Sequence, residues 1–418
     1  MTKSHFLFII FTSQSLFLTA QIALFEVGAG QGIITPSDTA YIAGHSHNRI
    51  FSGVNDDIFV KALVVSNRTD TIAILTFDCI GLLHPELERI RAGVLKELPD
   101  FPVDQIVMTS SHTHSGPDVV GLWGKDTYHS GVDKTYMSEL ISTTVSTLLD
   151  AWSNRQTTSV IYASGEHGSE WVYNISEPEE LDRSLTVLSF VNSDSETVAT
   201  LSNFACHPTF LDAVNDQVSS DYVGGYYAHM DQQRGGINLF LQGSIGGWVQ
   251  PEYEDKTVVQ AFFRGEELAK KAIDIINDPD TLFSNQILFD SKKFMLPVDN
   301  PGFRLLSDIG VLSRPFGDSV LTEVAVFSIG EATFATHPGE TVPQLSHRTK
   351  AMMPDGGPKF ILGLGMDALG YILKPYFFDQ AEKIPHSEYL CSVSLGISTQ
   401  ELIFNQLKQL FDQRRDKN

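Results

Sequence analysis

Two histidines one residue apart are the first feature of this sequence that could do chemistry. His112 and His114 stand in the stretch SSHTHSGPD, which continues the strand-like apolar run DQIVMTSS. Residues two apart in an extended chain point to the same face, so we expect both imidazoles to share one site. The alternative interpretation is a pair of polar loop residues that cap a helix.

Three more polar clusters follow apolar, strand-like runs. They are ACHPT with His207, the glycine-rich QGSIGG, and THPGE with His337 and Glu340. In open α/β sheets, ligands bind outside the carboxyl ends of strands, so we expect these clusters and the histidine pair to meet at one edge. Neutral imidazoles and a carboxylate are the ligand types of a hydrolytic zinc site, in which one position is left to water. His337 is a rival ligand beside Glu340.

Two other motifs allow either a functional or a structural interpretation. A second His-x-His, formed by His45 and His47, lies in an expected early loop, where a surface role fits equally well. The stretch GSIGGW would let the backbone approach a substrate and offer N–H groups to an oxyanion, or it is a plain tight turn. Trp248 at its end would contact the substrate or pack on the core.

The elements expected to position these residues alternate between strands and helices. We expect hairpins over 60–83 and 321–340, strands over 197–205 and 237–243, and helices over 84–98, 135–152, 256–278 and 398–413. This alternation favours an α/β fold with a mixed, layered sheet and flanking helices over separate α and β domains. No repeat or low-complexity linker interrupts the chain, so residues 22–418 are expected to form one domain.

The charge balance disfavours a nucleic-acid partner. The 418 residues include 51 acidic and 29 basic side chains, for a formal net charge of -22, and no basic patch is apparent. Such a surface repels nucleic acid and anionic membranes at long range. The sequence gives no indication of oligomeric state.

The N-terminal residues 1–21 are typical of a secretory signal peptide. Lys3 precedes an apolar stretch that begins at Phe6, and small residues follow in LTAQ. A membrane anchor is the alternative, but the apolar run is broken by TSQS and is short for a bilayer span. We therefore expect a chain without a stable membrane span, secreted or periplasmic, that begins between about residues 21 and 26.

Three cysteines are too few and too scattered for a disulfide framework. Cys79, Cys206 and Cys391 each follow an apolar or small stretch, and buried free thiols are the favoured interpretation. One disulfide with one free thiol is the alternative.

The sequence resembles the neutral/alkaline non-lysosomal ceramidase family. The resemblance covers most of residues 26–395 in family order, and HTHSGP after an apolar strand is its most specific part. The matching stretches are VGAGQGIITP, SGVNDDIFVKALVV, AILTFDCIGL, MTSSHTHSGPD, LSNFACHPTFL, VSSDYVGGY, LFLQGSIGG, HPGE and ALGYILKP.

This resemblance implies a zinc ion bound by two histidines, one glutamate and one tyrosine. The corresponding residues here are His112, His207, Glu340 and, from ALGYILKP, Tyr371. His114 would lie beside the metal and contact the substrate or the oxyanion.

A second family tyrosine, near the nucleophile, corresponds to Tyr389 in HSEYLCS.

The sequence also departs from the family. Ceramidases place a catalytic serine in a Gly-Asp-x-Ser-Pro-like loop after the LFLQG strand, and here the loop reads GSIGGWVQPEY. Gly247 replaces the aspartate, Val249 or Gln250 replaces the serine, and Ser244 lies too early in the loop. The chain stops soon after the last core motif, so we expect no C-terminal immunoglobulin-like domain.

These observations predict a secreted zinc-dependent hydrolase that cleaves an amide or ester bond with metal-activated water. Zinc lowers the pKa of bound water to roughly 7. The substrate is expected to be a small or lipid-like molecule. The alternatives are a true ceramidase that acts on N-acyl sphingolipids and a catalytically inactive, metal-bearing binding protein.

Overall fold

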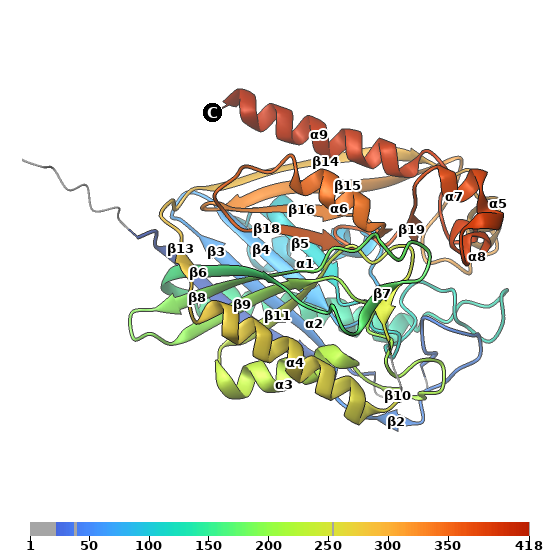
Figure 1. The fold of residues 1–418 in the computed structure, drawn as a ribbon, viewed down its shortest axis with the longest axis horizontal. Coiled ribbons are helices and arrows are strands. Elements are labelled where there is room, and N and C mark those ends of the chain that lie inside the picture. Colours follow the sequence, from blue (N-terminus) through green and yellow to red (C-terminus); the bar gives the residue numbers. More distant parts are fainter. Residues whose placement is uncertain (1–21, 37–39, 253–254, 418) are drawn as a thin grey trace, which may run out of the picture.

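One mixed sheet of nine strands organises the fold (Figure 1). The computed structural model describes residues 22–36, 40–252 and 255–417, so the expected signal peptide lies outside the described residues. The strand order is β11-β9-β8-β6-β1-β3-β4-β5, and β13 pairs with β6. The strands are β1 (Phe25–Ile33), β3 (Phe59–Ser66), β4 (Thr71–Phe77), β5 (Ile106–Ser110), β6 (Gln156–Glu166), β8 (Ser184–Asn192), β9 (Thr197–Phe204), β11 (Ile237–Gln242) and β13 (Asp280–Thr281).

The two ends of this sheet consist of parallel pairs, β4 with β5 and β9 with β11. The sheet also curls, as hydrogen bonds from side chains of β3 and β4 to main-chain carbonyls of β11 indicate. Lys61 Nζ donates to the Asn238 carbonyl at 2.9 Å, and Thr76 Oγ1 donates to the Phe240 carbonyl at 2.8 Å. The curl brings strands from opposite ends of the sheet close together, together with the loops that follow them.

A second sheet, of order β14-β15-β16-β18, packs across the first. Its strands are β14 (Ile287–Pro297), β15 (Ser319–Ile329), β16 (Ala332–His337) and β18 (Lys359–Gly363). The amide of Asn203 in β9 joins the sheets: its Nδ2 donates to the Ile361 carbonyl at 2.9 Å and its Oδ1 accepts from Ile361 N at 3.0 Å. Thr109 Oγ1 in β5 donates to the Gly363 carbonyl at 2.7 Å.

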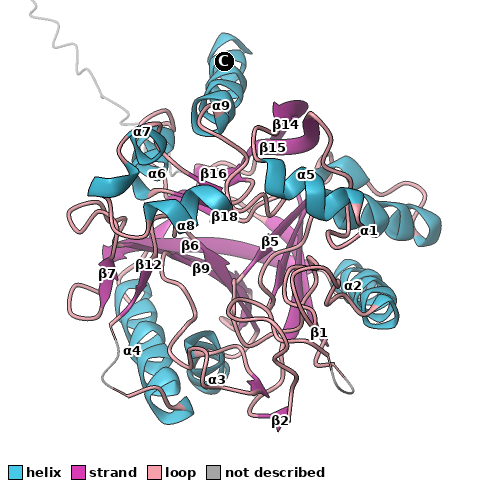
Figure 2. Ribbon diagram, turned by 90° about the vertical axis from the view of Figure 1, so that its right-hand side faces the viewer, coloured by secondary structure: helices cyan, strands magenta, loops and turns pink. Residues whose placement is uncertain are grey.

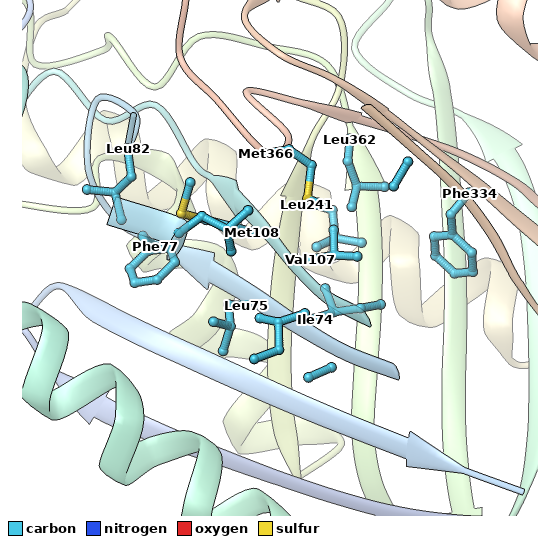
Figure 3. Close-up of a cluster of buried hydrophobic side chains, with 14 of the residues drawn as sticks. Ile74, Leu75, Phe77, Leu82, Val107, Met108, Leu241, Phe334, Leu362 and Met366 are labelled. Carbon is cyan, nitrogen blue, oxygen red and sulfur yellow. The ribbon is translucent and has the colours of Figure 1, made fainter. Parts of the chain in front are cut away.

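The hydrophobic core lies between the two sheets. Figure 3 shows side chains of β4, β5 and β11 facing those of β16, β18 and the segment after β18. All of those labelled are buried: Ile74, Leu75, Phe77, Leu82, Val107, Met108, Leu241, Phe334, Leu362 and Met366. Burial of so many aliphatic and aromatic groups is the main force that holds the sheets together.

Helices flank the sheets. In Figure 2, α1 (His84–Glu97) and α2 (Lys134–Ser153) lie beside one part of the large sheet, and α3 (Tyr222–Gln233) and α4 (Val258–Ile276) lie beside another. Figure 1 shows α9 (Thr399–Lys417) over the second sheet. The remaining helices are α5 (Pro301–Asp308), α6 (Pro343–Lys350), α7 (Tyr376–Asp379) and α8 (Ser387–Ser392), with 3-10 turns at Val103–Gln105 and Ala381–Lys383.

Three short ladders complete the fold. They pair β2 (Gly53–Val54) with β10 (Gln217–Val218), β7 (Val172–Asn174) with β12 (Val249–Pro251), and β17 (Glu340–Thr341) with β19 (Tyr371–Ile372). The last two lie next to the polar clusters that the sequence singles out.

The predicted fold class is confirmed. The hairpin over 60–83 is β3 with β4, the hairpin over 321–340 contains β15 and β16, and each predicted helix is present with its ends moved by a few residues. The cysteines are free thiols: Cys79 and Cys206 are buried, whereas Cys391 is partly exposed. None of the helices in the described part of the chain has the length and hydrophobicity that a membrane span requires.

Glycines on one face of β1 allow α2 to lie close to the sheet. Gly28, Gly30 and Gly32 alternate along the strand, and a Cβ built on Gly28 would lie 2.0 Å from the Ala151 carbonyl of α2. A side chain at Gly28 would therefore push the helix away from the sheet.

We expect Gly28→Ala to lower the free energy of unfolding by roughly 1–3 kcal/mol, the cost of overpacking a filled interior. Chemical denaturation measures this difference. Gly317→Ala is the matched control, because Gly317 is exposed and a Cβ there would have no contact closer than 4.0 Å. Equal stability of the two variants would contradict the close packing of α2 on β1.

Candidate metal centre

His112, His207 and Glu340 come together from three separate segments, two loops and the short strand β17. Glu340 Oε2 lies 3.0 Å from His207 Nε2 and 3.5 Å from His112 Nε2. All three side chains are buried. These segments follow β5, β9 and β16. In the described part of the chain, the three residues therefore meet beyond the ends of strands, as the sequence led us to expect.

His112 reaches the site by a left-handed backbone turn. It lies beyond the end of β5 with φ of 71°, a conformation that costs energy for a non-glycine residue. Its backbone N–H donates to the Cys79 carbonyl at 3.0 Å, and its Nδ1 lies 2.5 Å from the Ile80 carbonyl. The strand alternation expected for His112 and His114 is therefore wrong as the reason for their proximity: the loop folds both rings inward.

Val249 orients His207 through its backbone. The Val249 carbonyl accepts from His207 N at 2.9 Å and from His207 Nδ1 at 2.7 Å. Val249 belongs to β12, which pairs with β7, so the carbonyl is itself fixed by a ladder.

The hydrogen bonds fix the tautomer of both imidazoles. A carbonyl oxygen only accepts, so each Nδ1 facing one must carry the proton. In a neutral imidazole the Nε2 then holds a lone pair, and here both lone pairs face one carboxylate oxygen. Such an arrangement is favourable only with a cation between the atoms, either an added proton or a metal ion. The donor set fits zinc, which prefers His nitrogen and carboxylate oxygen in catalytic sites.

The pKa of the Glu340 carboxyl depends on this cation. Burial alone would raise the pKa, but with His112 and His207 protonated their charge and hydrogen bonds outweigh burial and lower it to about 2. A metal ion between the three groups would favour the carboxylate in the same direction.

The short β17–β19 ladder places Tyr371 next to Glu340. The two residues are direct partners in this parallel pair, and Glu340 N donates to the Gly370 carbonyl at 2.9 Å. The Tyr371 hydroxyl accepts from Trp248 Nε1 at 2.6 Å. Burial, with the negative charge of Glu340, raises the pKa of Tyr371 well above its ordinary value.

His114 is half-buried, and its two buried ring nitrogens have no side-chain hydrogen-bond partner among the described residues. One of its nitrogens lies within 4.8 Å of ligand atoms of both His112 and His207. Burial, followed by the neighbouring histidines, holds the pKa of His114 well below its ordinary value, so the ring is neutral. A neutral imidazole with free nitrogens can donate to a substrate or bind the metal.

His45 and Gly44 form the support behind His114. The His45 ring lies 5.0 Å from the His114 ring, and burial lowers the pKa of His45 to about 4. Gly44 has φ of 98°, and a Cβ there would lie 2.4 Å from the His114 ring. His47, the other half of this motif, is exposed near Thr127.

His337, the rival ligand, is bound elsewhere. Its Nδ1 lies 2.8 Å from Thr341 Oγ1 and its Nε2 lies 3.1 Å from Thr349 Oγ1, so both nitrogens have hydroxyl partners. Ser244 belongs to the same buried cluster, with its Oγ 2.8 Å from Thr341 Oγ1.

The loop GSIGGWVQPEY, which begins at Gly243, packs against the segment that carries Glu340. Gly246 N donates to the Thr341 carbonyl at 2.8 Å, and a Cβ on Gly246 would lie 2.4 Å from the Glu340 carbonyl. Gln250 Nε2 donates to the Tyr173 hydroxyl at 2.8 Å. The glycine-rich stretch therefore brings the loop against the Glu340 segment, as a tight-turn interpretation anticipates.

A cavity of about 60 Å³ opens onto the metal centre. Tyr389 lies at its rim, 48% exposed, with its ring 6.3 Å from that of Tyr371. The polar groups around the cavity are His112, His114, Glu340 and the two tyrosines, and none of the described residues that line it is a serine, threonine or cysteine.

The rest of the cavity wall is apolar, and sequence reasoning missed it. Trp123, Phe303, Leu312 and Phe316 come from segments outside the motifs that the sequence analysis singled out. The amphipathic pattern around Phe303 predicts a buried face of α5, but nothing in it indicates that this face borders the metal centre.

Comparison with known proteins matches this chain to one family. The family model described as neutral/alkaline non-lysosomal ceramidase, N-terminal, matches residues 25–262. The neutral ceramidase of Drosophila melanogaster is 22% identical over 253 residues, which are 54% of this chain and 34% of that protein. The neutral ceramidase of Drosophila pseudoobscura pseudoobscura is 22% identical over 232 residues, or 48% and 31%. The match thus spans about a third of these relatives.

Two solved structures share the fold over most of the chain. The neutral ceramidase from Pseudomonas aeruginosa superposes with a TM-score of 0.73 and 14% identity, over 94% of this chain and 75% of that one. A ceramidase complexed with C2 gives a TM-score of 0.77 and 15% identity, over 94% and 76%.

We expect protein purified without chelators to contain one zinc ion per chain, measured by elemental analysis. His112→Ala and Glu340→Ala should each lose the metal, because either change removes one of the few protein ligands and leaves an incomplete coordination set. His47→Ala is the matched control and should keep it. Full metal content in both ligand variants would contradict this centre.

Proposed function

This chain belongs to the neutral/alkaline non-lysosomal ceramidase family, and we propose that it is a zinc-dependent hydrolase of amide or ester bonds. The observation that carries the proposal is the cluster of His112, His207 and Glu340, two members of which, His112 and Glu340, line a cavity. Two imidazoles and a carboxylate next to a largely apolar cavity wall suit a metal ion that polarises a carbonyl.

His112, His207, Glu340 and Tyr371 are the proposed metal ligands. Bound there, Zn²⁺ would act as a Lewis acid toward the substrate carbonyl and would activate water. The Ile80 and Val249 carbonyls keep both histidine Nε2 atoms turned toward the centre. Hydrogen bonds from the other ring nitrogen to a main-chain carbonyl typically orient histidines that bind a metal.

His114 is the proposed donor to the oxyanion. Its neutral ring has one N–H, and no side chain among the described residues accepts a hydrogen bond from it. One such donor contributes about 3 kcal/mol to the stability of the tetrahedral transition state. Tyr389 at the rim is proposed to contact the departing group.

Water is proposed to attack directly, without a covalent acyl-enzyme. Hydrolysis adds the hydroxyl of water to the acyl carbon and its proton to the leaving nitrogen or oxygen, so no oxidant or further reactant is needed. Two observations support the direct route: no hydroxyl or thiol of serine, threonine or cysteine lines the cavity among the described residues, and Gln250 bonds Tyr173.

Cleavage of N-acyl sphingolipids is the second candidate. The apolar cavity wall favours it, whereas the small volume and the missing serine do not. An inactive binding protein, the remaining alternative, would show metal binding without turnover of any acyl compound.

We also propose that the chain is exported, on the basis of the signal-peptide pattern in residues 1–21.

We expect His114→Ala to lower kcat/KM about 100-fold with the metal retained, because one oxyanion donor is lost. Ser244→Ala, in the buried threonine cluster away from the cavity, should keep most activity. A panel of N-acyl and O-acyl compounds, including long-chain ceramide, supplies the assay, and ceramide should be poor. An acylated Ser244 peptide in mass spectrometry, or efficient ceramide cleavage, would contradict the proposal.

The proposal that the chain is exported is tested separately, by the mass of the exported protein. Intact mass of the protein recovered outside the cytoplasm should place its first residue between about 21 and 26. A full-length product in the cytoplasm would disprove this expectation.

A further inference from the structure

We propose that Trp248 is a positioning residue for Tyr371, because its indole N–H holds the phenol oxygen of Tyr371 at the metal centre. This inference rests on the proposed metal centre and adds a residue to it. Trp248 lies in the glycine-rich loop GSIGGWVQPEY, and none of the roles proposed so far for ligands, donor or leaving group includes it.

The hydrogen bond between Trp248 and Tyr371 has only one possible direction. An indole Nε1–H can donate but not accept, so the Tyr371 hydroxyl oxygen is the acceptor, at 2.6 Å. The hydroxyl hydrogen of Tyr371 must then point elsewhere, and Glu340 is the neighbouring acceptor. The phenol group is therefore held between Trp248 and a proposed metal ligand.

The backbone around Trp248 is itself fixed. Gly247 and Trp248 are both left-handed, with φ of 80° and 60°. Their carbonyls accept from Ser176 N and Ile175 N, each at 3.2 Å. A left-handed conformation costs energy for a residue with a side chain and persists where the surrounding structure holds it. The loop thus keeps the indole in one place.

Two further rings hold the indole. The Trp248 ring lies 4.5 Å from the His386 ring and 5.4 Å from the Tyr389 ring, measured between centroids. His386 precedes α8 and Tyr389 belongs to it. Aromatic contacts at these separations are favourable. The indole is therefore packed on its ring while its N–H is directed at Tyr371.

The backbone alone does not determine where the Tyr371 hydroxyl lies. The β17–β19 ladder pairs Tyr371 with Glu340 through the main chain, but the side-chain torsions of Tyr371 still decide the position of its oxygen. A hydrogen bond at the far end of the ring fixes that position. We expect Trp248 to orient Tyr371 as the Ile80 and Val249 carbonyls orient the two histidines. Partners behind a metal ligand typically change metal affinity by roughly 10–100-fold.

Zinc affinity tests this role without turnover. Trp248→Phe keeps an aromatic ring but removes the N–H, so it should weaken zinc binding about tenfold, measured by competition with a chromophoric chelator. Trp152→Phe is the matched control. The Trp152 ring lies 5.3 Å from that of Phe101, which precedes β5, whereas the metal centre follows β5. The control should bind zinc like the wild type.

A double variant shows whether Trp248 acts through Tyr371. Tyr371→Phe removes the hydroxyl that the indole holds, so adding Trp248→Phe to it should change zinc affinity by less than about twofold. If Trp248→Phe instead costs the same factor with and without the hydroxyl, Trp248 does not position Tyr371 and the proposal is overturned.

Copper(II) loaded in place of zinc reports the tyrosine directly, because a tyrosine oxygen bound to copper(II) gives a visible charge-transfer band. The wild type and Trp152→Phe should show this band, and Trp248→Phe should weaken or shift it. An unchanged band or unchanged zinc affinity in Trp248→Phe would overturn the proposal.

A sharper replacement keeps the test valid if Trp248→Phe does not fold. The tryptophan analogue β-(3-benzothienyl)alanine has sulfur in place of the N–H and nearly the same shape. Introduced at position 248, it removes only the donor, and the same losses in zinc affinity and in the copper band are expected.

The outcomes separate this inference from the proposed function. If the wild type binds zinc but its copper form shows no tyrosine band, Tyr371 is not a ligand and the role of Trp248 is wrong, while the hydrolase proposal with His112, His207 and Glu340 stands. If the wild type binds neither metal, the metal centre is wrong and the role of Trp248 falls with it.

Discussion

The repulsion between two imidazole lone pairs and a carboxylate is the constraint on which this site depends. Main-chain carbonyls hold the proton of His112 and His207 on Nδ1, and Glu340 occupies the space in front of both Nε2 atoms. Three electron-rich groups at these distances need a positive charge between them. The stability of this part of the molecule is therefore coupled to a positive charge, either an added proton or a metal ion, and a metal would couple binding to folding.

The crossing of the two sheets determines whether those three groups can meet. His112 and His207 follow strands near opposite ends of the large sheet, and Glu340 follows the second sheet. The curl of the first sheet brings β5 near β9 and β11. The Asn203 and Thr109 bonds then fix the position of β18 over both. The same burial that stabilises the core thus sets the distance between ligands.

Patterns of hydrophobicity were sufficient to predict the layered α/β fold and most of its helices and strands, because alternation and helical spacing are local. The grouping of His112, His207 and Glu340 could be anticipated from polar clusters at strand ends and from the family resemblance. The apolar wall could not, because Trp123, Phe303 and Phe316 meet only through tertiary contacts. The left-handed turn at His112 also has no local signal, since histidine rarely adopts it.

Because the main-chain carbonyls of Ile80 and Val249 orient the two histidines, the site should tolerate amino-acid substitutions at these two positions. A main-chain oxygen is present whatever the side chain, so substitution at either position leaves the histidine orientation intact while the backbone keeps its path. A loop can then carry an unreactive side chain at the expected serine position, Val249 or Gln250, and still support the neighbouring ligand. Disabling replacements should instead concentrate at crowded glycines such as Gly44 and Gly246, which determine where the backbone runs.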